Sequence, residues 1–183
     1  MTADAIAGVV LVLALAALGG GEMSPVQPAA QGAVQTVPSV DLERYAGRWY
    51  EISRFPNRFQ DKCTGEVTAT YTRRADGNID VVNRCQTKDG VSEAAGVARV
   101  VDSTSKAKLK VRFAPAFLSF LPMVWGDYWV IGLAPDYSWA VVGSPDRKYL
   151  WILARRPALD DAALAAAKAA ARTNGFDLSR LIR

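Results

Sequence analysis

The chain has few side chains that could do chemistry, because its 183 residues include no histidine. Histidine is the commonest general base and the commonest metal ligand in proteins. Its absence excludes a Ser-His-Asp triad and any zinc or haem that is held through imidazole. The remaining reactive candidates are two cysteines, Cys63 and Cys85, and several tyrosines. We therefore expect no catalytic residue, no metal and no cofactor.

The compartment decides whether Cys63 and Cys85 form a disulfide. Residues 6–18 are an unbroken apolar run followed by three glycines. This length suits the core of a signal peptide better than a membrane span, which needs about 20 apolar residues. An exported protein with two cysteines is expected to join them. The alternative, a free thiol nucleophile, has no evident base to lower its pKa.

The segment before residue 41 is expected to carry an export signal and a spacer. Residues 1–21 read as a signal peptide, with an uncleaved N-terminal anchor as the alternative because Asp4 precedes the apolar run and no basic residue does. No cysteine follows that run, so a lipid-modified lipoprotein is not expected. The prolines and lack of periodicity in residues 22–40 predict a flexible linker. The mature protein is then expected in the periplasm or outer envelope, soluble or loosely membrane-associated.

Residues 41–183 are expected to form one domain. Half of the residues in the chain are apolar, and its length is sufficient for one sizeable core. The formal net charge of +4 is mild, and lysine and arginine are scattered, so no nucleic-acid partner is expected. From residue 45 onward, short strands alternate with turn signals such as Asp76-Gly77. Sequential hairpins predict an all-β, up-and-down antiparallel barrel, and eight strands can enclose one small ligand. The predicted strands cover residues 47–55, 64–74, 78–87, 91–101, 106–113, 127–134, 138–144 and 148–155.

The last three strands are apolar on both faces, so a further element must cover the outside of the barrel. An alanine-rich helix predicted over residues 157–173 can do this, with Asp160 and Asp161 in its first turn and Gly175 just beyond its end. Its apolar stripe contains Leu159, Leu164 and Ala167. The alternative, a coiled-coil partner helix, is less consistent with one short helix after eight strands.

The sequence around residue 50 carries a family signature. Residues 42–54 read as a short polar helical turn, then Gly47, then a strand with Trp49 two residues later. This Gly-x-Trp motif resembles the signature of the lipocalins, eight-stranded barrels with one trailing helix. Residues 67–71, 76–77, 148–157 and 174–177 are similar to the bacterial outer-membrane lipocalins and apolipoprotein D. Residues 143–146 depart from the usual middle motif of the family, as they do in the outer-membrane subgroup. The resemblance spans residues 41–183.

The resemblance implies a structural role for Gly47, Trp49 and Arg155. In the family, an arginine of the last strand packs across the motif tryptophan and closes the narrow end of the barrel. A guanidinium over an indole gains cation–π attraction, and its donors can bond carbonyls of the preceding turn. Arg155 rather than Arg156 is expected here, because it shares the parity of Trp151 and Leu153.

Strand parity and the resemblance together predict one apolar pocket with a few polar groups. In residues 106–113, for example, Leu109, Val111 and Phe113 share one face, while the basic residues share the other. No lysine or arginine is clearly inward by this criterion. We expect a non-catalytic carrier or store of a fatty acid, lysophospholipid or similar lipid at the cell envelope. The predicted ligand contacts are Tyr71, Ile79, Val81, Asn83, Leu109, Val111, Phe113, Tyr128, Val130 and Trp151.

Residues 114–126 form a long, nearly uncharged apolar loop. We expect it to be a lid at the barrel mouth or to contact a membrane surface through Phe117, Phe120 and Trp125; the alternative is a loop packed over a strand. Two other functions stay open for the barrel as a whole. One is a lipid-modifying enzyme, and the other is a protein-interaction module of the envelope. The oligomeric state is not predicted.

Overall fold

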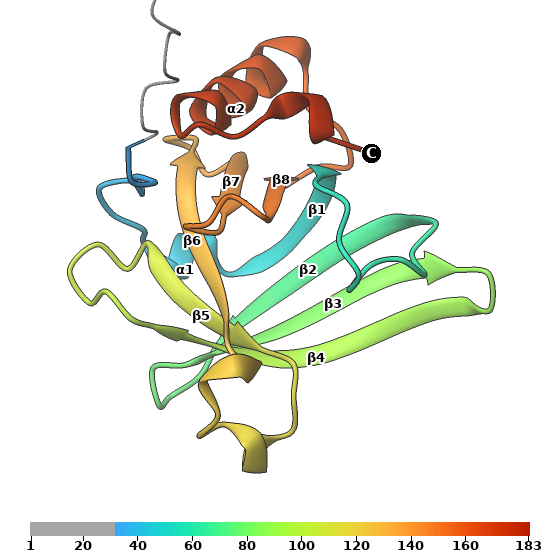
Figure 1. The fold of residues 1–183 in the computed structure, drawn as a ribbon, viewed down its shortest axis with the longest axis vertical. Helices are drawn as coiled ribbons and strands as arrows, with labels where there is room; N and C mark the ends of the chain where they lie inside the picture. Colours follow the sequence, from blue (N-terminus) through green and yellow to red (C-terminus); the bar gives the residue numbers. More distant parts are fainter. Residues whose placement is uncertain (1–31) are drawn as a thin grey trace, which may run out of the picture. The chain divides into compact units, whose positions relative to one another are not determined.

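A computed structural model describes residues 32–183, whose centre is a closed barrel of eight antiparallel strands in sequential order (Figure 1). β1 pairs with β8, so no strand edge is left unpaired by the closure. This arrangement confirms the predicted up-and-down barrel. The strands are β1 (Gly47–Arg54), β2 (Gly65–Arg73), β3 (Ile79–Thr87), β4 (Gly90–Val100), β5 (Lys108–Arg112), β6 (Gly126–Leu133), β7 (Trp139–Gly143) and β8 (Leu150–Ala154).

The strands alternate in direction, so the connecting segments fall into two groups at opposite ends of the barrel. The short helix α1 (Leu42–Tyr45) and the turns at 74–78, 101–107 and 134–138 lie at the end where β1 begins. Loops 55–64, 88–89, 113–125 and 144–149 lie at the other end, which we call the mouth. Loop 113–125 contains two 3-10 helices, η1 (Ala116–Leu118) and η2 (Pro122–Val124).

Two apolar clusters divide the buried side chains between the inside and the outside of the barrel wall. The inner cluster is centred on Trp49, Val81, Leu109 and Val142. The outer cluster lies between the wall and the C-terminal segment, and contains Val141, Leu150, Ile152, Ala167 and Phe176. The last strands contribute to both clusters, which explains why their sequences are apolar on both faces.

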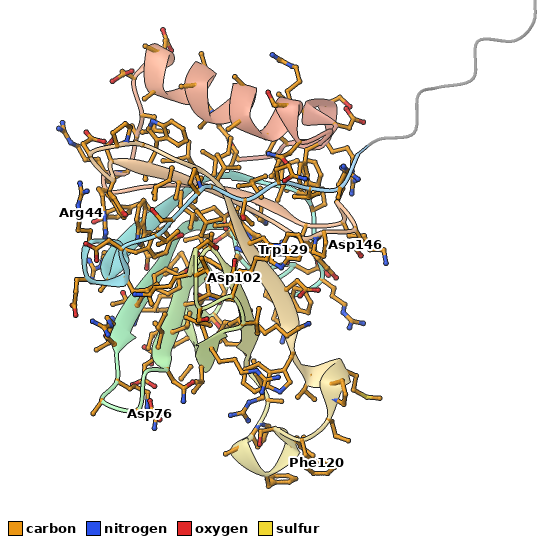
Figure 2. All side chains as sticks on the ribbon, turned by 90° about the vertical axis from the view of Figure 1, so that its left-hand side faces the viewer. Arg44, Asp76, Asp102, Phe120, Trp129 and Asp146 are labelled. Atoms are coloured by element: carbon orange, nitrogen blue, oxygen red, sulfur yellow. A yellow bond between two sulfur atoms is a disulfide. The ribbon has the colours of Figure 1, made fainter. Side chains whose placement is uncertain are left out.

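Helix α2 (Asp161–Thr173) covers the outer face of β6 and β7, and lies far from the loop that carries Phe120 (Figure 2). It begins four residues later than predicted, because Asp160 is its N-cap and accepts a hydrogen bond from Ala163 N at 2.8 Å. The helix packs closely because the wall beneath it contains glycine. A Cβ at Gly132 would lie 2.7 Å from Ala170 Cβ. A last 3-10 helix, η3 (Leu178–Arg180), follows.

Residues 32–40 pack against the barrel, which corrects the predicted flexible linker over this part of residues 22–40. Val34 lies in the outer cluster and Val40 in the inner cluster, both at most 5% exposed. Val37 N donates to Val130 O at 2.9 Å. These valines recur every three residues, so the extended segment can pass from the helix to the narrow end while burying one side chain at each step. The predicted signal segment and residues 22–31 lie outside the described residues.

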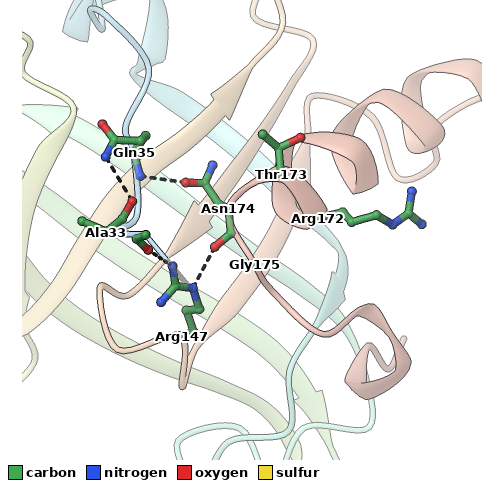
Figure 3. Close-up of a pocket in the computed structure, with 8 residues that line it drawn as sticks. Ala33, Gln35, Arg147, Arg172, Thr173, Asn174 and Gly175 are labelled. Atoms are coloured by element: carbon green, nitrogen blue, oxygen red, sulfur yellow. Dashed lines mark hydrogen bonds between the residues drawn. The ribbon is translucent and has the colours of Figure 1, made fainter. Parts of the chain in front are cut away.

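Arg147 ties this segment to the end of α2 at a shallow surface hollow (Figure 3). Its Nε donates to Asn174 O at 2.8 Å and its Nη2 to Gly32 O. Gln35 N donates to Asn174 Oδ1 at 2.7 Å. Since these contacts are made within the chain, the hollow is a structural junction. No helix within residues 32–183 is long and apolar enough to cross a membrane.

Candidate ligand-binding site

The narrow end of the barrel is sealed by Trp49. Its side chain is fully buried, and its indole Nε1 donates to Tyr45 O at 2.8 Å. The Arg155 guanidinium carbon lies 3.9 Å from the centre of the Trp49 ring, and Arg155 Nη1 and Nη2 donate to the carbonyls of Arg48 and Arg44 at 3.0 and 2.5 Å. A Cβ at Gly47, where φ is +95°, would lie 3.3 Å from Arg155 Nη1. The structure thus places Gly47, Trp49 and Arg155 together as a floor.

Above this floor, three tyrosine hydroxyls form a hydrogen-bonded chain. Tyr45 Oη lies 2.8 Å from Tyr128 Oη, and Tyr128 Oη donates to Tyr71 Oη at 2.9 Å. Burial raises the pKa of Tyr71 to about 12 and raises the pKa of Tyr45 and of Tyr128 well above the usual value. All three phenols therefore stay protonated at neutral pH. Two of them were expected ligand contacts, whereas Tyr45 comes from α1 and was not.

The inner wall above the tyrosines is apolar and partly accessible. Val111, Tyr128 and Trp151 pack against the inner cluster but keep intermediate exposure, so part of each residue is accessible to solvent. Asn83 pairs with Ala69 and shares the parity of Val81, which turns it inward. The expected contacts that lie in or against the inner cluster are Tyr71, Ile79, Val81, Leu109, Val111, Tyr128, Val130 and Trp151.

Phe113 lies at the rim, one residue beyond the end of β5. It is 42% exposed, and its ring covers Gly96, where an added Cβ would lie 2.7 Å from Phe113 Cδ1. A second group of aromatic rings leads from the rim into the barrel. Phe59 and Tyr149 have ring centres 5.6 Å apart, and Tyr149 stacks on Trp151 at 5.9 Å.

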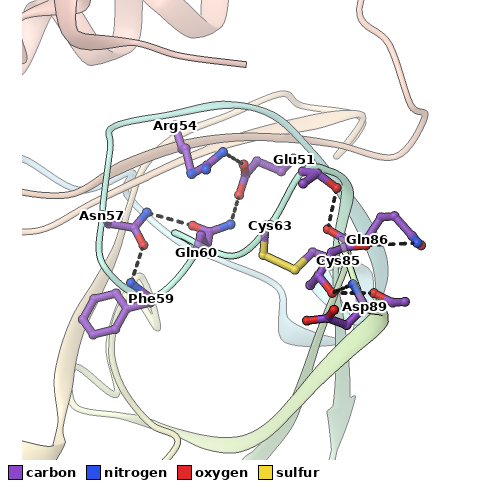
Figure 4. The surroundings of a disulfide bond; sticks show 12 residues. Glu51, Arg54, Asn57, Phe59, Gln60, Cys63, Cys85, Gln86 and Asp89 are labelled. Carbon is purple, nitrogen blue, oxygen red and sulfur yellow. Dashed lines mark hydrogen bonds and ion pairs between the residues drawn. A yellow bond between two sulfur atoms is a disulfide. The ribbon is translucent and has the colours of Figure 1, made fainter.

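The mouth contains a polar network that parity did not predict (Figure 4). Arg54 Nη1 lies 2.9 Å from Glu51 Oε1, and both side chains are almost completely buried. Gln60 Nε2 donates to the other Glu51 oxygen at 2.6 Å. Gln60 Oε1 accepts from Asn57 Nδ2 at 2.8 Å and from Trp151 Nε1 at 3.0 Å. Loop 55–64 is therefore held over the mouth through Gln60.

A β-bulge explains why Arg54 faces inward. Glu51 pairs with Leu153, but the register shifts before Ser53, and Arg54 then pairs with Trp151. Cross-strand partners share a face of the sheet, so Glu51 and Arg54 both join the inner side. By strand parity alone, no lysine or arginine had a clear inward position. The structure corrects this expectation, because the bulge turns Arg54 inward. Burial raises the pKa of Glu51, against the lowering effect of Gln60 and Arg54.

One donor of this network is free. Among the described residues, Arg54 Nε is buried and has no hydrogen-bond partner. A buried donor without an acceptor is unfavourable, and a guanidinium favours anionic acceptors. Arg54 is thus a candidate contact for an anionic group at the mouth.

The predicted disulfide between Cys63 and Cys85 is confirmed, with Cα atoms 5.6 Å apart. It fixes the far end of loop 55–64 to β3 beside the polar network (Figure 4). Both cysteines are consumed by the bond, which contradicts the alternative of a free thiol nucleophile.

Loop 113–125 projects from the mouth, and Phe120 lies near its tip (Figure 2). Phe117 and Phe120 are 74% and 76% exposed, whereas Trp125 is held at the base. The guanidinium carbons of Arg99 and Arg112 lie 4.2 and 5.3 Å from the Trp125 ring centre. Phe117, Phe120 and Trp125 were predicted to act together. The structure places the two phenylalanines in the exposed part of the loop and Trp125 at its base.

Comparisons with known proteins identify the family. The family model of the lipocalin-like domain matches residues 40–183, so the chain belongs to the lipocalin family. It is 42% identical over 150 residues to temperature-induced lipocalin-1 of Arabidopsis thaliana, covering 81% of this chain and 80% of that protein. It is 40% identical over 151 residues to the outer membrane lipoprotein Blc of Escherichia coli K12, covering 81% of both. The fold is similar to that of insecticyanin from the tobacco hornworm (TM-score 0.65, 20% identity, 85% of this chain and 86% of that chain). Lipocalins bind small hydrophobic ligands.

Proposed function

We propose that this protein is a non-catalytic carrier or store of a single-chain lipid, such as a fatty acid or a lysophospholipid. The observation that carries the proposal is the polarity gradient inside the barrel. Trp49 closes one end, an apolar wall follows, and Arg54 offers an unpaired donor at the other. An acyl chain would be buried along the wall, at about 0.8 kcal/mol per methylene before the costs of association. Its carboxylate or phosphate would bind at Arg54.

The interior chemistry favours a carrier over a lipid-modifying enzyme. The tyrosines of the inner wall hold their protons at neutral pH, because burial raises their pKa. Glu51 is bonded to both Gln60 and Arg54. A general base must have a free acceptor atom for the proton that it takes. The protonated tyrosines cannot act in this way, and both carboxylate oxygens of Glu51 already accept hydrogen bonds.

Native mass spectrometry of the protein purified from its host would test this function directly. A co-purified single-chain lipid at stoichiometric occupancy is expected. Delipidated protein should then bind hexadecanoic acid with micromolar affinity or better, measured by displacement of a fluorescent fatty acid. An empty barrel that ignores fatty acids and lysophospholipids would defeat the proposal and favour an envelope protein-interaction module.

We also propose that loop 113–125 contacts a membrane surface at the cell envelope and does not close as a lid. Trp125 is held against the arginines Arg99 and Arg112, while the uncharged tip points away from the barrel. Two other mouth segments also carry an exposed apolar side chain, Phe59 in loop 55–64 and Val91 in β4, and such side chains suit insertion at a lipid interface. In loop 113–125 the exposed ones are Phe113, Phe117, Phe120 and Met123. The relationship to an outer membrane lipoprotein supports an exported protein.

Vesicle co-sedimentation tests this contact. Replacing Phe117, Phe120 and Met123 by serine, with Trp125 kept, should reduce binding to phosphatidylcholine and phosphatidylglycerol vesicles at least tenfold. Val101→Ser is the matched control, because Val101 is 50% exposed at the opposite end of the barrel. Equal vesicle binding by the triple variant and the wild type would refute the contact.

A further inference from the structure

The tyrosine chain at the narrow end has more hydroxyl protons than its hydrogen bonds use. Three phenol groups supply three protons, but only two hydrogen bonds join Tyr45, Tyr128 and Tyr71. Tyr128 donates its only proton to Tyr71, so Tyr45 must be the donor to Tyr128. Among the described residues, no acceptor bonds the remaining proton, which belongs to the hydroxyl of Tyr71.

This free donor lies on the inner wall of the barrel, next to a partly accessible tyrosine. Tyr71 is 7% exposed on the inner face of β2, opposite Gly47. Tyr128, to which it is bonded, keeps intermediate exposure on the same inner wall. A buried hydroxyl proton without an acceptor is unfavourable, so an acceptor atom at this position would be stabilised.

The surroundings select a neutral acceptor over an anion. Among the described residues, Tyr71 packs in a cluster of apolar side chains and tyrosines. The nearest cation of the floor, Arg155, lies over the Trp49 ring and already donates to the Arg44 and Arg48 carbonyls. An ionised group buried at Tyr71 would therefore lack a counter-charge, whereas a hydroxyl or carbonyl oxygen requires none.

We propose that the tyrosine chain is a specificity site for a neutral oxygen on the end of the lipid that enters the barrel first. The preferred ligands are then single-chain lipids that carry a hydroxyl or carbonyl near the terminus remote from the head group. This proposal rests on the proposed carrier function, which places the head group at Arg54. Arg54 lies seven residues along β1 from Gly47, the partner of Tyr71. A rise of about 3.3 Å per residue separates the two polar sites by roughly 20 Å along the wall, which suits a long acyl chain.

Two positional isomers test the proposal in the wild-type protein. 16-Hydroxyhexadecanoic acid and 2-hydroxyhexadecanoic acid have the same composition, and only the first can present its hydroxyl to Tyr71 while its carboxylate lies at the mouth. Displacement of a fluorescent fatty acid measures both affinities. The 16-hydroxy isomer should bind about tenfold more tightly than the 2-hydroxy isomer, because one hydrogen bond contributes about this factor to the affinity. Equal affinities, or tighter binding of the 2-hydroxy isomer, would overturn the proposal.

A double variant tests whether the tyrosines cause this difference in affinity. The double replacement Tyr71→Phe and Tyr128→Phe should reduce the affinity ratio of 16-hydroxyhexadecanoic to hexadecanoic acid about tenfold. Tyr50→Phe, on the outer face of β1, should leave that ratio unchanged. An unchanged ratio in the double variant refutes the role of the tyrosines. If the double variant does not fold, the isomer comparison still decides. Failure of the wild type to bind hexadecanoic acid would instead refute the carrier function.

Discussion

Glu51 and Arg54 face each other inside the barrel mouth, although they are three positions apart on β1. Strict alternation would place them on opposite faces of the sheet. Glu51 faces inward by its alternation with Trp49, the bulge between Glu51 and Ser53 turns Arg54 inward as well, and Gln60 completes the network from the adjoining loop. A charged pair is thus placed at the mouth, next to the apolar interior of the barrel.

Removing the charge of Glu51 and removing the charge of Arg54 should change the affinity for anionic ligands in opposite directions. Glu51→Gln removes the carboxylate that competes for Arg54, so hexadecanoic acid should bind more tightly. Adding Arg54→Gln removes the cation without leaving a buried charge, and affinity should then fall at least tenfold below that of Glu51→Gln. Displacement titrations measure both effects. Methyl hexadecanoate, which has no charge, should bind all three proteins alike; an equal loss for acid and ester would contradict a head-group role.

The burial of Glu51 also predicts a pH effect on stability. Burial raises the pKa of Glu51 in the folded protein above its unfolded value, so the folded state binds this proton more tightly. As the pH falls from 7 through the folded pKa, the free energy of unfolding of the wild type should rise relative to Glu51→Gln. The gain is complete below the unfolded pKa. Urea unfolding at a series of pH values measures this difference, and a flat or decreasing difference would show that Glu51 is not desolvated.

Periodic features of the sequence predicted the barrel well. The eight strands, their turns and the covering helix follow from alternation and turn chemistry that are local in the chain. The resemblance to the lipocalins implied that an arginine of the last strand contacts Trp49. The choice of Arg155 over Arg156 needed only continuous parity, since Trp151, Leu153 and Arg155 are two residues apart. Residues that continue a regular pattern could therefore be placed.

Features that break a pattern could not be placed from one sequence. The bulge in β1 has no proline or glycine to mark it, so Arg54 was assigned to neither face. Tyr45 enters the inner cluster from α1, outside any strand alternation. Trp125 resembles its apolar neighbours in type, yet it packs on Arg99 and Arg112, which are distant along the chain. Each of these depends on tertiary contacts rather than on local periodicity.

The floor of the barrel should depend on the guanidinium group of Arg155 specifically. Lysine at this position keeps the charge but cannot stack on Trp49 and bond two carbonyls at once. Arg155→Lys should lower the free energy of unfolding by about 2 kcal/mol. Arg156→Lys is the matched control, since the exposed Arg156 should tolerate the change. Equal urea midpoints for the two variants would mean that the stacked arrangement adds no stability.

The disulfide should stabilise the fold without contributing directly to ligand binding. Cys63 and Cys85 are 22 residues apart, and closing a loop of this length contributes about 3 kcal/mol in the chain-entropy model. Replacing both by serine should lower the unfolding free energy by roughly this amount. Affinity for hexadecanoic acid should change less than threefold at a temperature where the variant stays folded. A large loss of affinity would show that the bond also positions Gln60.

Close packing of α2 gives a last test, at Gly132 of β6. An added Cβ would lie 2.7 Å from Ala170 Cβ and 3.3 Å from Val141 Cβ. Neither neighbour can rotate away, so the helix must shift, which typically costs about 1–3 kcal/mol. Gly132→Ala should therefore lower the unfolding free energy by this amount. At Gly126, on the same strand, the nearest atoms to an added Cβ are 3.8 Å away, so Gly126→Ala should be nearly neutral. Similar urea midpoints for the two variants would indicate that α2 adjusts to the added methyl group at little cost.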